Sequence, residues 1–169
     1  MELSVLERRD VINGVEQILH APGNYSGGIL EMTVVIDASM AKEDVAELVP
    51  CVLSQLKRHS EVFRNTLFHV IYWINDETME DVKNSMSMAM LSSFYENYRQ
   101  QKEMKKVESL LAYLRLFHAR SKLILLFTPE GYRVEDETKA NDLLQPFLGR
   151  KLLRISNASG FQVKRMRTV

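Results

Sequence analysis

The 169-residue sequence predicts an α/β fold: a three-layer sandwich in which helices flank a mostly parallel central sheet. Short apolar, β-branched runs alternate along the chain with amphipathic stretches of about 12 or more residues. This alternation indicates βαβ units, whose consecutive strands are parallel. The composition agrees, because 46% hydrophobic and 26% charged residues are typical of one globular domain with a sizeable core.

An amphipathic helix is expected at the start of the chain. Residues 3–19 place apolar side chains at a spacing of three and four among charged ones, with Gly14 as a weak point. A cluster of glycine and proline at 21–28 then favours turns. We therefore expect two parts: an N-terminal helix and glycine-rich linker at 1–28, and a single α/β domain at 29–169. The helix packs either on this domain or on a partner.

The remaining elements follow from apolar runs and helical spacing. Strands are expected at 29–36, 66–74, 122–127 and 151–155. Helices are expected at 42–59, 77–101, 104–119 and 135–148, and those at 77–101 and 104–119 form either two helices or one bent helix. Residues 161–166 form either a fifth strand or a basic tail.

Charge and cysteine content exclude several classes of function. The 22 basic and 22 acidic residues cancel, so no overall field favours nucleic acid or an anionic membrane. No apolar run approaches the roughly 18 residues of a membrane span. The single cysteine, Cys51, forms no internal disulfide, and no secretory segment follows Met1, which indicates a cytoplasmic protein.

Polar residues follow the predicted strands, where open α/β sheets bind their ligands. They are Asp37, Ser39, Asp76, Thr128 and Glu130. Carboxylate and hydroxyl oxygens are the ligands that magnesium prefers. Alternatively, Ser39 caps the following helix while Asp37 accepts backbone donors in its own turn.

Three of these strand ends resemble the von Willebrand factor A domain family, which has a Rossmann-like fold. In VVIDASMA, Asp37 and Ser39 match the first two positions of the family's Asp-x-Ser-x-Ser metal motif. HVIYWIND ends at Asp76, much as the family's second strand ends at an aspartate. LLFTPEG keeps Thr128 and Gly131 of a Thr-Asp-Gly phrase.

The metal motif of the family is only partly present. Ala41 replaces its second serine, and Pro129 and Glu130 stand where the aspartate belongs. The glycine-rich turn with a metal-binding threonine has no counterpart before residue 104. The resemblance therefore implies a degenerate metal-ion-dependent adhesion site, which holds either no metal or a weakly bound magnesium ion at Asp37, Ser39 and Glu130.

What the resemblance implies for function is a non-catalytic module that binds a protein partner through its strand-end rim, within a larger intracellular complex. Cytosolic members of the family often work beside AAA-type ATPases. The expected partner-binding residues are Asp76 and Thr128, together with a methionine face on the helix at 77–101, formed by Met79, Met86 and Met90.

Two other functions stay open from the sequence. A metal-dependent hydrolase would use Asp37 with Asp76 or Glu130 as metal-bearing or acid-base carboxylates. A self-assembling structural subunit would bury the N-terminal helix and the methionine face against neighbouring copies.

Overall fold

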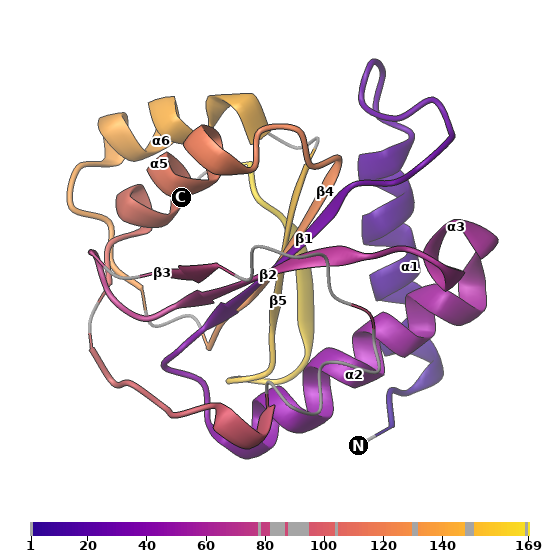
Figure 1. Cartoon of the computed structure of the whole chain (residues 1–169), viewed down its shortest axis with the longest axis horizontal. Coiled ribbons are helices and arrows are strands. Elements are labelled where there is room, and N and C mark those ends of the chain that lie inside the picture. The colour runs from indigo at the N-terminus through magenta and orange to yellow at the C-terminus, as the bar shows by residue number, and fades with distance from the viewer. Residues whose placement is uncertain are drawn as a thin grey trace.

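The computed structural model describes residues 2–77, 79–81, 87, 95–103, 105–129, 132–147, 151–167 and 169. In this part of the chain, six strands form one sheet in the order β3-β2-β1-β4-β5-β6 (Figure 1). The strands are β1 (Met32–Asp37), β2 (Phe68–Trp73), β3 (Met79–Asp81), β4 (Leu123–Phe127), β5 (Leu152–Ser156) and β6 (Gln162–Arg165). β1, β2, β4 and β5 are parallel, whereas the edge strands β3 and β6 are antiparallel to their neighbours. The predicted α/β fold with a mostly parallel sheet is confirmed.

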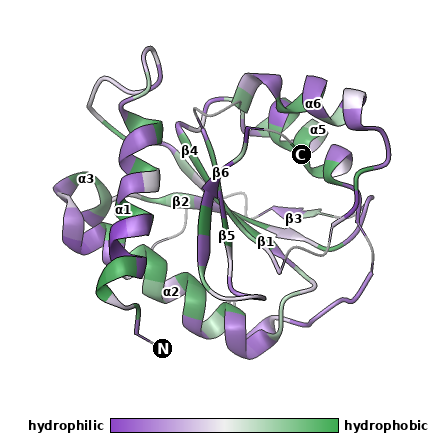
Figure 2. Cartoon of the chain, turned by 180° about the vertical axis from the view of Figure 1, so that it is seen from behind, coloured by the Kyte–Doolittle hydropathy of each residue, from purple (hydrophilic) through white to green (hydrophobic). Residues whose placement is uncertain are grey.

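Helices cover both faces of this sheet and complete the three layers (Figure 1). One face carries α1 (Val5–Leu19), α2 (Lys42–His59) and the short α3 (Glu61–Arg64). The other face carries α5 (Val107–Phe117) and α6 (Glu137–Leu144), which is followed by a 3-10 turn at Gln145–Phe147. Figure 2 shows hydrophilic and hydrophobic stretches alternating along these helices, as in helices that bury one side. No helix among the described residues has both the length and the hydropathy needed to cross a membrane.

The strands at the centre of the sheet are buried on both faces. Every residue of β1 and β4 is buried, as expected for parallel strands between two helical layers. Successive side chains point to opposite faces, so Val34 joins the core beneath α1 and α2, and Val35 joins the core beneath α5 and α6. The first strand starts later than expected, at Met32, and Ile29 is fully exposed.

The N-terminal helix packs on the sheet and belongs to the same core as β1. A capping box between Ser4 and Glu7 starts the helix. Its buried face consists of Val11, Val15, Ile18 and Leu19. A Cβ atom at Gly14 would lie 3.0 Å from Leu153 Cδ1 and 3.1 Å from Val163 Cγ1. Gly14 therefore lets the helix approach β5 and β6 closely, and it is a packing position rather than a weak point.

The expected helix at 77–101 is wrong at both of its ends. Met79 lies in β3, where it pairs with Trp73, so it is on a strand and not on a helical face. The pairing satisfies backbone groups along the outer edge of β2, a tertiary gain that outweighs the helical spacing of the sequence. Residues 98–103 have neither helical nor strand structure. Met86 and Met90 lie outside the described residues.

The segment at 161–166, which the sequence left open, contains the strand β6. It forms an antiparallel hairpin with β5, in which Arg154 pairs with Lys164. Gly160, at φ +95°, takes up a conformation in the connecting turn that few other residues adopt. β6 closes one edge of the sheet with an exposed lysine, and the three-residue β3 closes the other.

Candidate functional site

Three of the predicted strand-end residues meet where the strand order reverses. The chain builds the sheet outward from β1 to β3, returns to place β4 on the other side of β1, and continues outward to β6. Doubly wound sheets bind ligands at such a reversal, just beyond the carboxyl ends of the strands. Asp37 is the last residue of β1, and Thr128 comes directly after β4. Topology thus brings Asp37, Ser39 and Thr128 to one point.

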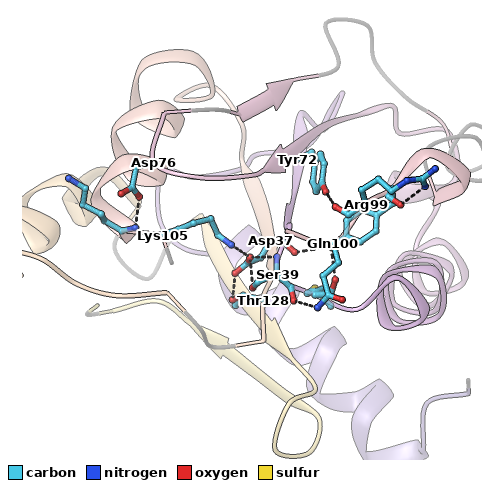
Figure 3. A network of polar contacts seen from close by, with 11 residues as sticks. Asp37, Ser39, Tyr72, Asp76, Arg99, Gln100, Lys105 and Thr128 are labelled. Carbon is cyan, nitrogen blue, oxygen red and sulfur yellow. Dashed lines mark hydrogen bonds and ion pairs between the residues drawn. The ribbon is translucent and has the colours of Figure 1, made fainter. Parts of the chain in front are cut away.

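Both carboxylate oxygens of Asp37 are held by groups of the same chain (Figure 3). The backbone amide and the hydroxyl of Ser39 donate to Oδ1 at 2.9 and 2.7 Å. The hydroxyl of Thr128 donates to Oδ2 at 2.9 Å. Asp37 thus accepts a backbone amide in its own turn, which is one of the two alternatives expected from the sequence. Ser39 does not cap the helix, because the N-cap of α2 is Ala41, which makes no side-chain hydrogen bond.

A lysine that sequence reasoning missed supplies the counter-charge of Asp37. The Nζ atom of Lys105 forms an ion pair with Oδ1 of Asp37, and both side chains are almost fully buried. The same ammonium lies 5.1 Å from the centroid of the Trp73 ring, a cation-π arrangement. A buried carboxylate needs a charge partner and hydrogen-bond donors, and Asp37 has both.

The direction of Lys105 follows from the backbone ahead of α5. Lys106 is extended, with φ −91° and ψ 134°, and forms a bridge with Arg133. Successive side chains of an extended backbone point to opposite sides, so Lys105 turns inward and Lys106 outward. The sequence offered one weak signal of this ion pair, a lysine just before the amino end of a helix. The positive end of the helix dipole disfavours a cation there unless a carboxylate lies nearby.

A second segment, residues 98–101, closes over the loop that follows β1. Its contacts reach three successive residues of that loop: Gln101 N to Ala38 O at 2.7 Å, Gln100 Nε2 to Ser39 O at 2.9 Å and Tyr98 Oη to Met40 O at 2.7 Å. Figure 3 shows Tyr72 reaching this segment from β2, and its hydroxyl donates to the carbonyl of Arg99. The exit of β1 is therefore covered by the chain itself.

The phenol of Tyr98 stays protonated in this cover. Burial raises its pKa, and the nearby Tyr72 and the carboxylate of Asp37 raise the pKa further. The hydroxyl therefore serves as a hydrogen-bond donor to the loop, and its second contact is the carbonyl of Asp37 at 3.3 Å.

The described residues at Asp37 do not fit a divalent cation. The lysine ammonium already holds the cation position against Oδ1, which also accepts both Ser39 donors, and Oδ2 accepts the hydroxyl of Thr128. Within the described part of the chain, no three histidine, cysteine, aspartate or glutamate side chains gather at one point. Glu130 lies outside the described residues, so its part in the predicted metal site stays a prediction.

Asp76 belongs to a separate, partly exposed group. Its Oδ1 accepts the backbone amide of Lys106 at 2.6 Å, and its Oδ2 lies 3.6 Å from Nη2 of Arg133. Lys106 Nζ reaches Oε2 of Glu135 at 2.7 Å. This hydrogen bond raises the pKa of Lys106 and lowers the pKa of Glu135. We call Asp76, Lys106, Arg133 and Glu135 the charged lip.

The predicted partner-binding residues thus have different surroundings. Asp76 is partly exposed in the charged lip, whereas Thr128 is buried against Asp37. Met79 is half-buried and packs against the core beneath α5 and α6. Their role in binding a partner stays a prediction.

Comparison with known proteins leaves the family of this chain open. No protein-family model matches the chain, and no curated protein matches it in sequence.

Proposed function

We propose that this chain is a non-catalytic protein-interaction module, similar to a von Willebrand factor A domain, in which Lys105 takes the place of the divalent ion. The observation that carries the proposal is the buried ion pair between Lys105 and Asp37 at the reversal of strand order. A tethered ammonium supplies positive charge at the point where a metal would otherwise supply it, and it needs no ion from solution.

In this proposal the ion pair holds the surface that the partner meets. Lys105 ties the segment before α5 to the end of β1, and the next residue, Lys106, belongs to the charged lip. Arg133 and Glu135, at 47% and 59% side-chain exposure, are the most accessible members of the lip. Two acidic and two basic side chains alternate there, which suits a protein surface with matching charges better than a polyanion.

Burial supports a non-catalytic role. Asp37 and Thr128 are fully buried, and their side-chain oxygens are hydrogen-bonded to one another. Asp76 is held by a backbone amide and by Arg133. The resemblance noted in the sequence makes an AAA-type ATPase, or another subunit of an intracellular complex, the expected partner.

The test is affinity capture from the native host with the full chain and two charge-reversal variants. Arg133→Glu reverses a charge in the lip. Arg120→Glu is the matched control, because Arg120 is 91% exposed and precedes the amino end of β4. We expect one partner to be retained by the wild type and by the control, and to be weakened about tenfold or more by Arg133→Glu. Equal recovery with all three proteins would contradict docking at the lip.

A metal arm of the same experiment tests the role of Lys105. Capture in the presence of a chelator should match capture in millimolar magnesium or manganese, because the positive charge is part of the chain. Recovery that depends on added metal would show that a divalent ion, and not the lysine, completes the surface.

A further inference from the structure

A pocket lies at the opposite end of the sheet from the charged lip. It opens between α2, α3 and the amino ends of β1 and β2, and its volume is about 210 Å³. Figure 1 shows α3 beside the start of β2, where this pocket lies. The floor is apolar and almost fully buried, and it consists of Met32, Leu53, Leu56, Phe63 and Phe68.

The mouth of the pocket is basic. Lys57 and Arg64 line the pocket itself, and both also line an adjoining hollow together with Arg58. Among the described residues, no acidic side chain lines either space. Arg64 has a weak partner in Glu61 at 3.3 Å, an ion pair in which both side chains are exposed. The mouth therefore keeps an excess of positive charge.

The ends of the helices explain only part of this arrangement. Basic residues in the last turn of α2 complement its dipole, which accounts for Lys57 and Arg58. The dipole does not call for an apolar hollow beneath them, and side chains that border an empty space lose packing contacts. An apolar floor below a cationic mouth matches a ligand with an apolar tail and an anionic head.

We propose that this pocket binds a small anionic amphiphile, a carboxylate with a short apolar tail. The tail fills the floor between Leu56, Phe63 and Phe68, and the carboxylate lies between Lys57 and Arg64. The volume is below the roughly 300 Å³ at which pockets for larger ligands begin, which suits a medium-chain acid. This site is independent of the charged lip, because it lies at the amino ends of the strands.

Calorimetry with octanoate on the full chain tests the proposal, with octylamine as the probe of opposite charge. We expect saturable binding of octanoate and none of octylamine. The double variant Lys57→Glu/Arg64→Glu changes only exposed side chains and should weaken octanoate about tenfold or more. The matched control, Lys164→Glu on β6, should bind as the wild type does. Equal binding of both probes, or unchanged binding by the double variant, would overturn the proposal, and so would the absence of saturable binding.

A methyl signal locates the bound tail. In protein labelled at the methionine methyl groups, the Met32 signal is assigned by its loss in Met32→Leu. Octanoate should shift this signal with the same midpoint as the calorimetric curve, because Met32 forms part of the floor. Binding that leaves the Met32 signal in place would assign octanoate to another surface and refute the site.

Discussion

The pair formed by Asp37 and Lys105 illustrates how a buried charge is tolerated. Removing two ions from water costs several kcal/mol each, and their attraction offsets this cost only when further hydrogen bonds satisfy the remaining atoms. Here Ser39 and Thr128 supply three such bonds to the carboxylate. The pair gains little over an apolar replacement of both partners, but loss of one partner leaves the other charge buried.

Lys105→Met should therefore destabilise the protein strongly. We expect a loss of about 3–5 kcal/mol in the free energy of unfolding, because the Asp37 carboxylate stays buried without its counter-charge. The double variant Asp37→Asn/Lys105→Met should recover much of that loss. The neighbouring variant Lys106→Met, whose partner is exposed, should lose far less stability than Lys105→Met. Urea denaturation measures all three, and similar losses for Lys105→Met and Lys106→Met would contradict this account.

Tyr98 links stability to alkaline pH. Its folded pKa is raised above the ordinary value of 10.0, by burial first and then by Tyr72 and Asp37. The contribution of the Tyr98 phenol to stability is therefore complete below pH 10. It is lost as the pH rises above that value toward the pKa of Tyr98 in the folded protein. Tyr98→Phe should cost about 1 kcal/mol or more near neutral pH, since the bond to Met40 is lost.

Above pH 10 the difference in the free energy of unfolding between Tyr98→Phe and the wild type should become smaller. Denaturation at a series of pH values provides the measurement, and tyrosinate absorbance reports the ionisation directly. Because the other five tyrosines are present in both proteins, the difference reports Tyr98 together with its coupling to Tyr72. If this difference stays constant in strongly alkaline solution, the pKa of Tyr98 is not raised in the folded protein.

At the scale of elements, the sequence predicts buried structure better than edge structure. β1 and β4 were evident because strands covered on both faces are continuous apolar runs. The described part of β3, Met79–Asp81, is too short for a period-two pattern, and β6 carries polar side chains that also suit a tail. Both edge strands are determined by their pairing with a neighbouring strand. A single sequence does not show that pairing.

The same limit applies to the candidate site. Asp37 and Thr128 could be placed together because parallel strands end at one edge of a sheet. Lys105 and Lys106 could not be distinguished, since they are identical side chains in one polar segment. Only the extended backbone and the bridge to Arg133 decide which of them points inward.

The approach of α1 to the sheet depends on Gly14. Gly14→Ala adds a methyl group about 3 Å from Leu153 and Val163, and overpacking of this kind typically costs about 1–3 kcal/mol. The gain in helix propensity, about 1 kcal/mol, offsets only part of the cost. We expect a net loss of about 1 kcal/mol by thermal or urea denaturation. The control Asn13→Ala, at an exposed position of the same helix, should be neutral or slightly stabilising. If Gly14→Ala instead stabilises the protein, the side chains on β5 and β6 move to accommodate the added methyl group.

At the scale of the whole molecule, two cores share one sheet, and α1 belongs to the core that also contains α2 and β1. The helix is thus an integral layer of the fold and contributes four buried side chains. The 29–169 segment lacks this layer, so its apolar face on β5 would meet water.

Deletion of residues 1–28 should consequently abolish cooperative folding. We expect the 29–169 fragment to lose its thermal transition in circular dichroism and to bind a hydrophobic dye. Leu6→Ser in the full chain is the control, because Leu6 is 60% exposed and its loss should change stability by about 0.5 kcal/mol or less. If the fragment melts at the same temperature as the full chain, the fold does not depend on α1.

The two borders of the sheet also bear on how molecules of this chain meet one another. Unpaired strand backbones attract further strands from other molecules, and natural proteins prevent this with brief or charged border strands. In the part of the chain that the structure describes, one border strand spans three residues and the other presents Lys164 to solvent. Growth of fibrils by lateral stacking of strands is therefore disfavoured, and any self-assembly of this chain would depend on contacts between side chains.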